Sequence, residues 1–370
     1  MAEGRLLITG STGFIGQALL ARLPPMRPVR LLVRDRRRVQ VPATSEVLEG
    51  DLRDPQLLAK AVAGCEAVVH LAAVIDADAP TLEAVNVLAT RGLRDAARAA
   101  GVRRFVFLSS EKVLRQPWDA YARSKAQLED ELKGGFPHLT ILRPTMVYGP
   151  GDTRYVGRLL AWLARWPAVP VPGGVDSALQ PGVVDDVVAC ILGALEGRGD
   201  GGPYVVAGPD RVRPHDLVSA LGKALGRPRA VVHIPWPLFV VAVRIASVSK
   251  GAPIRVNQLR SLRFDHQYDA EATARVFGYC PTSVAEGCRR LVDAWRAAAA
   301  KSATRSRSHH ELSVDIAIPV AAVVRLPGMP RCRRRPGGCR GRADEAGQAD
   351  QRGILGVALA PHADVDAAQA

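Results

Sequence analysis

A glycine-rich turn, TGSTGFIG at residues 9–16, constrains the fold of this chain more than any other feature. The apolar run RLLI (5–8) precedes it, and apolar residues at helical spacing follow it over 14–23. The glycines therefore lie where a strand turns into a helix. Gly10 permits the tight turn, Gly13 lets the backbone approach a pyrophosphate, and Gly16 lets the helix pack against the strand. Free N–H groups at a helix start bind phosphate. The predicted dinucleotide site comprises Thr9, Gly10, Ser11, Thr12, Gly13, Phe14, Ile15 and Gly16.

Strand and helix patterns alternate over the first 145 residues. The predicted strands lie near 5–9, 29–33, 46–49, 67–71, 104–108 and 139–142. Such alternation gives a parallel sheet with right-handed crossovers. Beyond Gly149 the pattern loosens into helices, with short strands near 203–207 and 230–234 and a closing helical stretch over 269–300. We predict an α/β fold with a doubly wound parallel sheet over residues 1–300, whose smaller C-terminal part, from about residue 150, caps the substrate.

Residues 301–370 have no periodicity and few large apolar residues. This composition predicts a disordered tail. An aberrant, out-of-frame segment is the alternative for the same stretch.

Composition narrows the functional classes. The net charge is +14, nearly all of it from arginine, but no aromatic-interleaved basic stripe accompanies it, so we predict no nucleic-acid partner. No apolar run is long enough to span a bilayer, and no basic-then-apolar leader begins the chain. The six cysteines lack metal-ligand spacing, which predicts no metal site and favours reduced thiols in the cytoplasm. The apolar segment 236–248 is interpreted as a core helix, and peripheral contact with lipid is the alternative.

Residues after the next strands extend the predicted cofactor site. Arg34 follows the second strand, where arginine suits a ribose 2′-phosphate and an acid suits a free 2′-hydroxyl. We therefore favour NADP, with NAD as the alternative because Asp35 comes next. Asp51 and Leu52 follow the third strand, where the carboxylate could accept from the adenine amino group or cap the next helix. After His70, which we interpret as a packed strand-end residue, small side chains leave space beside the cofactor at Leu71, Ala72 and Ala73.

The segment YARSK contains the most specific pair of reactive groups. Tyr121 and Lys125 are four residues apart and share one helix face, so the ammonium should lower the pKa of the phenol and make it a usable acid and base. Ser110 ends the fifth strand, where it could hydrogen-bond a substrate oxygen, and Asn86 lies on the preceding helix.

In this order, TGSTGFIG, GDL, HLAA, Asn86, LSS, YARSK and LRPTMVYGP resemble the extended branch of the short-chain dehydrogenase/reductase superfamily, the NAD-dependent epimerase/dehydratase group with a Rossmann fold. The resemblance covers residues 4 to about 298. It implies that Ser110, Tyr121 and Lys125 are catalytic, that Asn86 supports a proton-relay water, and that Lys125 also binds the nicotinamide ribose. It further implies that Pro144, within Arg143-Pro144-Thr145, shapes the nicotinamide end.

Two departures narrow the reaction. Sugar dehydratases of this family place an Asp-Glu pair after the Ser/Thr, whereas this chain has Glu111 and Lys112, and an ammonium cannot act as that base. In addition, only 11 positions (121 − 110) separate Ser110 from Tyr121, a shorter loop than sugar epimerases of the family have. Dehydration is therefore disfavoured and a nucleotide-sugar substrate is in doubt.

The short loop and the stretch LRPTMVYGPGDTRYVGRLL are similar to a second subgroup, related to the nucleotide-binding accessory subunit of respiratory complex I, in which bound NADP(H) can be structural. Two hypotheses follow. The first is an NAD(P)-dependent oxidoreductase or epimerase acting by hydride transfer at a secondary alcohol or ketone of a small molecule, with a nucleotide sugar among the candidates. The second is an NADP(H)-binding assembly or stability factor with little or no catalysis. Family helices near 81–100 and 119–133 often pair subunits, so a homodimer is open.

Overall fold

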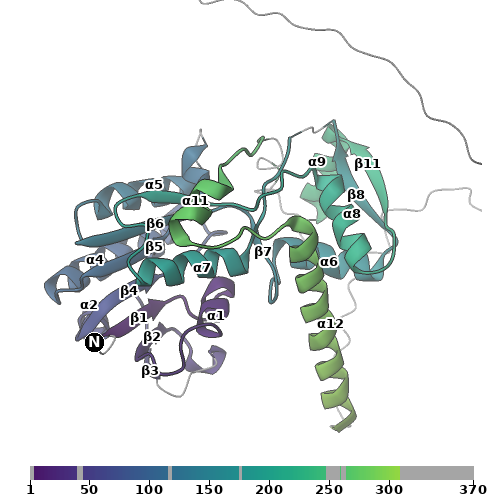
Figure 1. Ribbon diagram of the computed structural model, residues 1–370. Coiled ribbons are helices and arrows are strands. Elements are labelled where there is room, and N and C mark those ends of the chain that lie inside the picture. The colour runs from purple at the N-terminus through teal and green to yellow at the C-terminus, as the bar shows by residue number, and fades with distance from the viewer. Residues whose placement is uncertain are drawn as a thin grey trace, which may run out of the picture. The chain divides into compact units, whose positions relative to one another are not determined.

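The computed structural model describes residues 4–39, 45–115, 119–174, 177–246, 259 and 264–308. All of them belong to one compact unit, Met1–Val314 (Figure 1). Residues 309–370 lie outside the described residues, so the predicted disordered tail remains a prediction for them.

A seven-stranded parallel sheet forms the centre of the molecule, in the order β10-β6-β5-β4-β1-β2-β3. The order reverses between β1 and β4, and ligands of such sheets bind at the carboxyl ends of the strands beside this point. The doubly wound Rossmann fold is confirmed, and the strands lie within two residues of the predicted positions. They are β1 (Arg5–Thr9), β2 (Val29–Val33), β3 (Ser45–Glu49), β4 (Cys65–His70), β5 (Arg104–Leu108), β6 (His138–Pro144) and β10 (Pro203–Val206).

Two layers of helices cover the sheet because the strands are apolar on both faces. One layer packs against the cluster that contains Ile8, Val106 and Leu142, and it consists of α1 (Phe14–Leu20), α7 (Val184–Leu195) and α11 (Ala270–Phe277). The other packs around Leu7, Phe105 and Phe107, and it consists of α2 (Pro55–Val62), α4 (Ala89–Ala99) and α5 (Ala120–Leu132). Short turns complete these layers: η1 (Arg36–Arg38), α3 (Ala79–Leu82), the π-helical turn η2 (Glu83–Leu88) and η3 (Glu111–Leu114).

The smaller C-terminal part, which we call the capping part after its predicted role, has its own apolar core, which includes Tyr148, Leu160, Leu221 and Val292. Around it lie α6 (Tyr155–Arg165), α8 (Pro214–Ala224), α12 (Val284–Ser308) and two small parallel pairs, β8 (Ala168–Gly173) with β11 (Ala230–Pro235) and β7 (Val147–Tyr148) with β9 (Gly182–Val183). The sequence predicted β11 but not its partner β8. In addition, α12 continues to Ser308, eight residues past the predicted end of the folded part at 300.

Helix α9 (Trp236–Ala246) is only half a core helix. Phe239 and Val243 are buried together with Leu259, whereas Leu238, Val241 and Ile245 are more than half exposed. The core interpretation of this segment therefore holds for one face only. Within the described part of the chain, no helix is long and apolar enough to cross a membrane.

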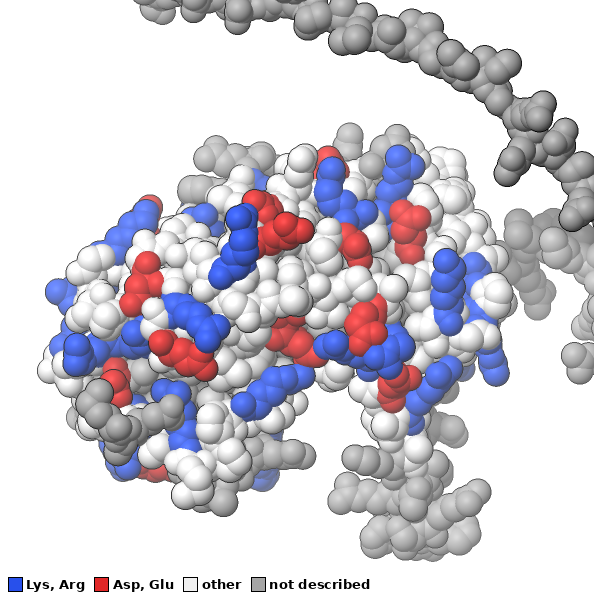
Figure 2. Space-filling view, viewed as in Figure 1, with Lys and Arg blue, Asp and Glu red and all other residues white. Residues whose placement is uncertain are grey.

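Acidic and basic side chains lie side by side on the face shown in Figure 2. Ion pairs between such side chains occur in the described part of the chain, for example those of Arg290 with Asp185 and Glu286. This face therefore carries mixed charge rather than a stripe of one sign.

Candidate active site

The carboxyl ends of the parallel strands bring the predicted cofactor residues to one edge of the sheet. Thr9 ends β1, Leu71 follows β4, and the Leu71 N–H donates to the Thr9 carbonyl at 3.1 Å. At the same edge, Arg34 follows β2, Asp51 and Leu52 follow β3, and Pro144 ends β6. The fold thus gathers five chain segments that are far apart in the sequence.

The glycine turn is closely packed against the residues after β4. Gly10 has a φ of +76°, and a Cβ built on it would lie 2.5 Å from the Ala72 backbone nitrogen. A Cβ on Gly16 would lie 2.4 Å from the Gly10 carbonyl oxygen, so α1 can approach the turn only because residue 16 is glycine. Gly13 differs because it is exposed, has a φ of −81° and would place a Cβ no closer than 3.2 Å to another atom. A methyl group at Gly13 would therefore be tight against the Gly10 carbonyl oxygen but would need only a small shift, unlike one at Gly10 or Gly16.

This turn fits a dinucleotide. Gly13 begins α1 without a side-chain cap, which leaves the first N–H groups of the helix available to phosphate oxygens. The buried Ser11 Oγ has no hydrogen-bond partner among the described residues, and a buried hydroxyl is normally bonded. Thr9–Gly16, with Ala72 and Ala73 opposite, would hold the pyrophosphate.

The adenosine end carries exposed arginines. Arg37 donates to both Asp35 oxygens, at 3.0 and 3.2 Å, and holds the pKa of that carboxyl below its usual range. Asp51 is engaged in the same way by Arg53, whose side chain and backbone N–H lower the pKa of the carboxyl to about 2. Arg34 is exposed, and its charge helps to lower the pKa of the Asp51 carboxyl.

Helix α5 places Tyr121 and Lys125 beside the end of β5. The Lys125 ammonium donates to the Leu108 carbonyl at 2.7 Å, lies 4.5 Å from the centroid of the Phe107 ring and 6.0 Å from that of Tyr121. Ser110, two residues after Leu108, caps η3 by accepting from the Lys112 N–H at 3.3 Å. The structure therefore places Lys125 beside Tyr121 and at the end of β5, two residues before Ser110, and their catalytic role stays a prediction.

The electrostatics of this pair differ from the expectation. Burial raises the pKa of Tyr121 well above its ordinary value of 10.0, and Tyr155, Asp119 and Glu111 raise it further. Burial also lowers the pKa of Lys125 to about 7, against the opposing effect of Glu129. The expected lowering of the phenol pKa is therefore wrong for this structure, because loss of hydration is the largest effect on this group and outweighs the opposing charge of Arg154. At neutral pH the phenol keeps its proton.

Two buried polar side chains anchor the surrounding segments. Asn86, on η2, donates to the Val74 carbonyl at 2.8 Å and accepts from the Val74 N–H at 2.9 Å. His70 lies between the hydroxyls of Thr9 and Thr90, at 2.6 and 2.8 Å, and burial lowers its pKa to about 3. His70 is thus a neutral, packed residue, as predicted from its position at the strand end.

Sequence reasoning missed a buried network behind Lys125. The Glu129 carboxylate accepts from Ser109 and, at 3.0 Å, from the Arg143 Nε, so it connects α5 to the ends of β5 and β6. Its position four residues after Lys125 puts it on the same helix face, a spacing that could have revealed it. Among the described residues, no cluster of His, Cys, Asp and Glu is suited to a metal.

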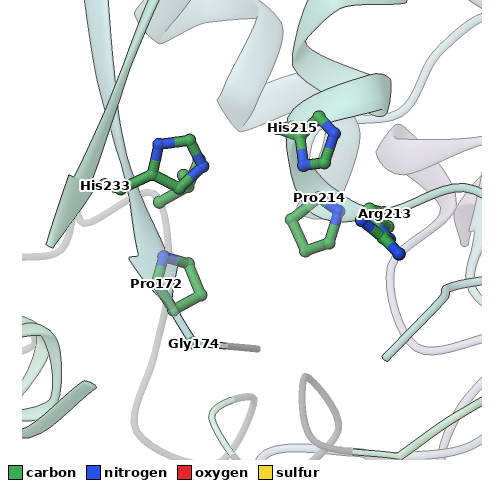
Figure 3. Close-up of a pocket in the computed structure, with 7 residues that line it drawn as sticks. Pro172, Gly174, Arg213, Pro214, His215 and His233 are labelled. Atoms are coloured by element: carbon green, nitrogen blue, oxygen red, sulfur yellow. The ribbon is translucent and has the colours of Figure 1, made fainter. Parts of the chain in front are cut away.

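A separate cavity of about 170 Å³ lies in the capping part, between the ends of β8 and β11 and the start of α8 (Figure 3). The rings of His215 and His233 face it with centroids 6.2 Å apart, and Arg213 and Pro172 also line it. This cavity contains none of the predicted catalytic residues.

Residues 6–207 match the NAD dependent epimerase/dehydratase family, and the chain belongs to this family. It is 39% identical over 180 residues to a ceramide reductase of Caulobacter vibrioides, a match that covers 46% of this chain and 54% of that protein. It is 29% identical to the 2-alkyl-3-oxoalkanoate reductase of Stenotrophomonas maltophilia, covering 78% of this chain and 98% of that enzyme.

The similarity to a complex I subunit is also present. The chain is 29% identical to the mouse mitochondrial NADH dehydrogenase [ubiquinone] 1 alpha subcomplex subunit 9, over 63% of this chain and 64% of that protein. Among solved structures, the dTDP-glucose 4,6-dehydratase of Streptomyces venezuelae, which contains NAD, superposes with a TM-score of 0.62 at 25% identity, covering 79% of this chain and 97% of that chain.

Proposed function

We propose that this protein is an NADP(H)-dependent oxidoreductase that transfers hydride between the nicotinamide and a secondary alcohol or ketone. The observation that carries the proposal is the placement of Tyr121 and Lys125 by α5 next to Ser110, at the same sheet edge as the glycine turn. The reductases among its relatives support the same reaction class.

The protonation states favour reduction of a ketone. When bound, the cofactor supplies the hydride. The phenol of Tyr121 keeps its proton at neutral pH, so it can donate that proton to the oxygen that gains negative charge. Ser110 Oγ would hold the same oxygen, and Lys125 would bind the nicotinamide ribose. Arg143, held by Glu129, would keep Pro144 in place at the nicotinamide end.

NADP is favoured over NAD by the charges after β2. Asp35, the acid that could bind a free 2′-hydroxyl, is already engaged by Arg37, whereas Arg34 is exposed. A guanidinium binds a 2′-phosphate through charge-assisted hydrogen bonds. The dissociation constants of NADPH and NADH test this preference directly.

Tyr121→Phe tests the reaction. In the full-length protein, with NADPH and a panel of ketones, this variant should lose about 10²–10⁴-fold in kcat/KM while its affinity for NADPH stays nearly unchanged. Tyr204→Phe, a β10 residue whose ring packs on Phe277, is the matched control and should keep its activity. Wild-type turnover by Tyr121→Phe would contradict the assignment.

An epimerase of the same chemistry would return the hydride to its substrate and retain its nucleotide. The identity, redox state and exchange rate of the nucleotide that copurifies distinguish the two. Rapid exchange with added NADPH supports a net reductase, and a tightly held nucleotide supports an epimerase or a structural cofactor.

The second candidate function is an NADP(H)-binding assembly or stability factor, supported by the similarity to the mouse complex I subunit. It predicts that NADPH raises the melting temperature while no ketone is reduced. The joint presence of Ser110, Tyr121 and Lys125 favours the enzyme.

Location and assembly belong to the same proposal. Free thiols at Cys65, Cys190, Cys280 and Cys288 support a cytoplasmic protein. Leu88, 52% exposed where η2 meets α4, supports a homodimer through this surface. Light scattering of the wild type and of Leu88→Lys would test the dimer.

A further inference from the structure

Lys112 places a second ammonium beside the predicted catalytic hydroxyls. It lies on η3, two residues after Ser110, and its own backbone N–H donates to the Ser110 hydroxyl at 3.3 Å. Its side-chain nitrogen is 5.7 Å from the centroid of the Tyr121 ring. Lys112 therefore contacts both residues that would hold the reacting oxygen.

The position of this ammonium is held by Asp119, the N-cap of α5, at 3.0 Å. The side chain of Lys112 is 27% exposed, so part of its hydration shell can be exchanged for a ligand. A lysine ammonium has three N–H donors, and Asp119 uses only one of them.

Two cations lie near Tyr121 without being buried, Lys112 and Arg154, and Lys112 is the one that belongs to the same turn as Ser110. Lys125 is buried, donates to the Leu108 carbonyl and is assigned to the nicotinamide ribose, so it is not the group expected to bind a substrate anion. The nearest other acid, Glu111, is paired with Arg115 and accepts from the Tyr268 hydroxyl at 3.3 Å. Its charge is therefore neutralised by groups other than Lys112.

We propose that Lys112 binds the carboxylate of the substrate, which makes 3-oxo and 3-hydroxy carboxylates the substrate class. This inference rests on the proposed hydride transfer at the same site. In a 3-oxo carboxylate the anion is two carbons from the ketone, so a ketone oxygen held by Ser110 and Tyr121 brings the carboxylate close to the Lys112 ammonium. One relative, named for a 2-alkyl-3-oxoalkanoate, acts on a compound of this class.

The test compares a carboxylate with its neutral ester. Oxidation of 3-hydroxyoctanoate and of methyl 3-hydroxyoctanoate is followed with NADP⁺ in the full-length protein. Lys112→Gln should raise KM for the acid about tenfold, because a charge-assisted hydrogen bond is lost. Its KM for the ester should change less than about twofold. Lys112→Arg should restore the acid KM, and Lys133→Gln, which removes an exposed lysine paired with Asp130, is the matched control.

Equal effects of Lys112→Gln on the acid and the ester, or no effect on either, would overturn the proposal. Failure of the carboxylate site must be distinguished from failure of the proposed reaction. For this purpose, the binding of 3-hydroxyoctanoate to the NADPH-saturated protein is measured by calorimetry, which needs no turnover. If neither substrate turns over, binding that is lost in Lys112→Gln still supports the carboxylate site, and absence of binding to the wild type refutes it.

Discussion

The side-chain amide of Asn86 binds both polar groups of the Val74 peptide, donating to its carbonyl at 2.8 Å and accepting from its N–H at 2.9 Å. Val74 follows Leu71–Ala73, which pack against Gly10, so Asn86 sets the path of the chain beside the glycine turn. Asn86 lies in a π-helical turn, a rare form that is frequent at functional sites. The Asn86 amide thus holds the segment after β4 in position beside the glycine turn.

Asn86→Ala should weaken both stability and cofactor binding. The substitution leaves the Val74 peptide without its partners, which costs about 1–3 kcal/mol in the free energy of unfolding. The dissociation constant for NADPH should rise because the segment after β4 is no longer held. Asn86→Asp keeps the bond from the Val74 N–H but turns an acceptor towards the Val74 carbonyl. Its free energy of unfolding should therefore lie below that of the wild type. A fully stable Asn86→Ala protein with wild-type NADPH affinity would contradict this role.

Substitutions of two glycines of the turn should have different effects, one on stability and the other on NADPH affinity. Gly16→Ala forces a Cβ to within 2.4 Å of a backbone oxygen and should lower the free energy of unfolding by about 3 kcal/mol. Gly13→Ala places its Cβ 3.2 Å from the same oxygen, a tight contact that a small shift relieves, so the protein should remain folded. It should nevertheless bind NADPH about tenfold more weakly, because the added methyl group faces the pyrophosphate. Chemical unfolding and fluorescence titration measure the two effects, and equal losses of stability would count against the distinction.

Arg34→Ala should lower the affinity for NADPH and leave that for NADH unchanged. Removal of one charge-assisted hydrogen bond to a 2′-phosphate costs about 1.5–3 kcal/mol, or roughly 10- to 100-fold in the dissociation constant. Arg98→Ala, an exposed arginine at the end of α4, is the control for net charge. If Arg34→Ala raises the dissociation constants of NADPH and NADH equally, the arginine does not bind the 2′-phosphate.

His70 should make the protein sensitive to acid. Its pKa is about 3 in the folded protein against an ordinary 6.5, because it is buried between Thr9 and Thr90. Between these two pH values the unfolded chain binds a proton that the folded protein does not, so the free energy of unfolding falls as the pH falls. The contribution reaches about 1.4 kcal/mol per pH unit.

His70→Gln has no titrating group, so its unfolding free energy should depend less steeply on pH between about 6.5 and 4.5 than that of the wild type. Urea unfolding at a series of pH values compares the two slopes. Parallel slopes would show that His70 does not titrate in this range.

Local patterns were sufficient for most of the fold. The apolar runs near 29–33 and 104–108 became β2 and β5, and the strand, turn and helix around TGSTGFIG formed as predicted. These signals are local because a strand buried on both faces must be apolar at most positions, and because Gly16 is required by contacts within its own turn. The contact that requires Gly10 is with Ala72, after a distant strand, although its positive φ belongs to the turn itself. Strand β8 was missed because its run contains Pro170 and Pro172 and its partner β11 is distant in the sequence.

The sequence by itself determined which reactive groups this protein has and that Tyr121 and Lys125 share a helix face. Only the tertiary structure decided their chemical state. Burial, which depends on everything packed around α5, raised the pKa of Tyr121 although a lysine lies four residues away. The tertiary structure also placed Lys112 against Tyr121 and Asn86 against Val74. Spacing along a helix reports neighbours on that helix, whereas hydration and contacts between segments are properties of the assembled fold.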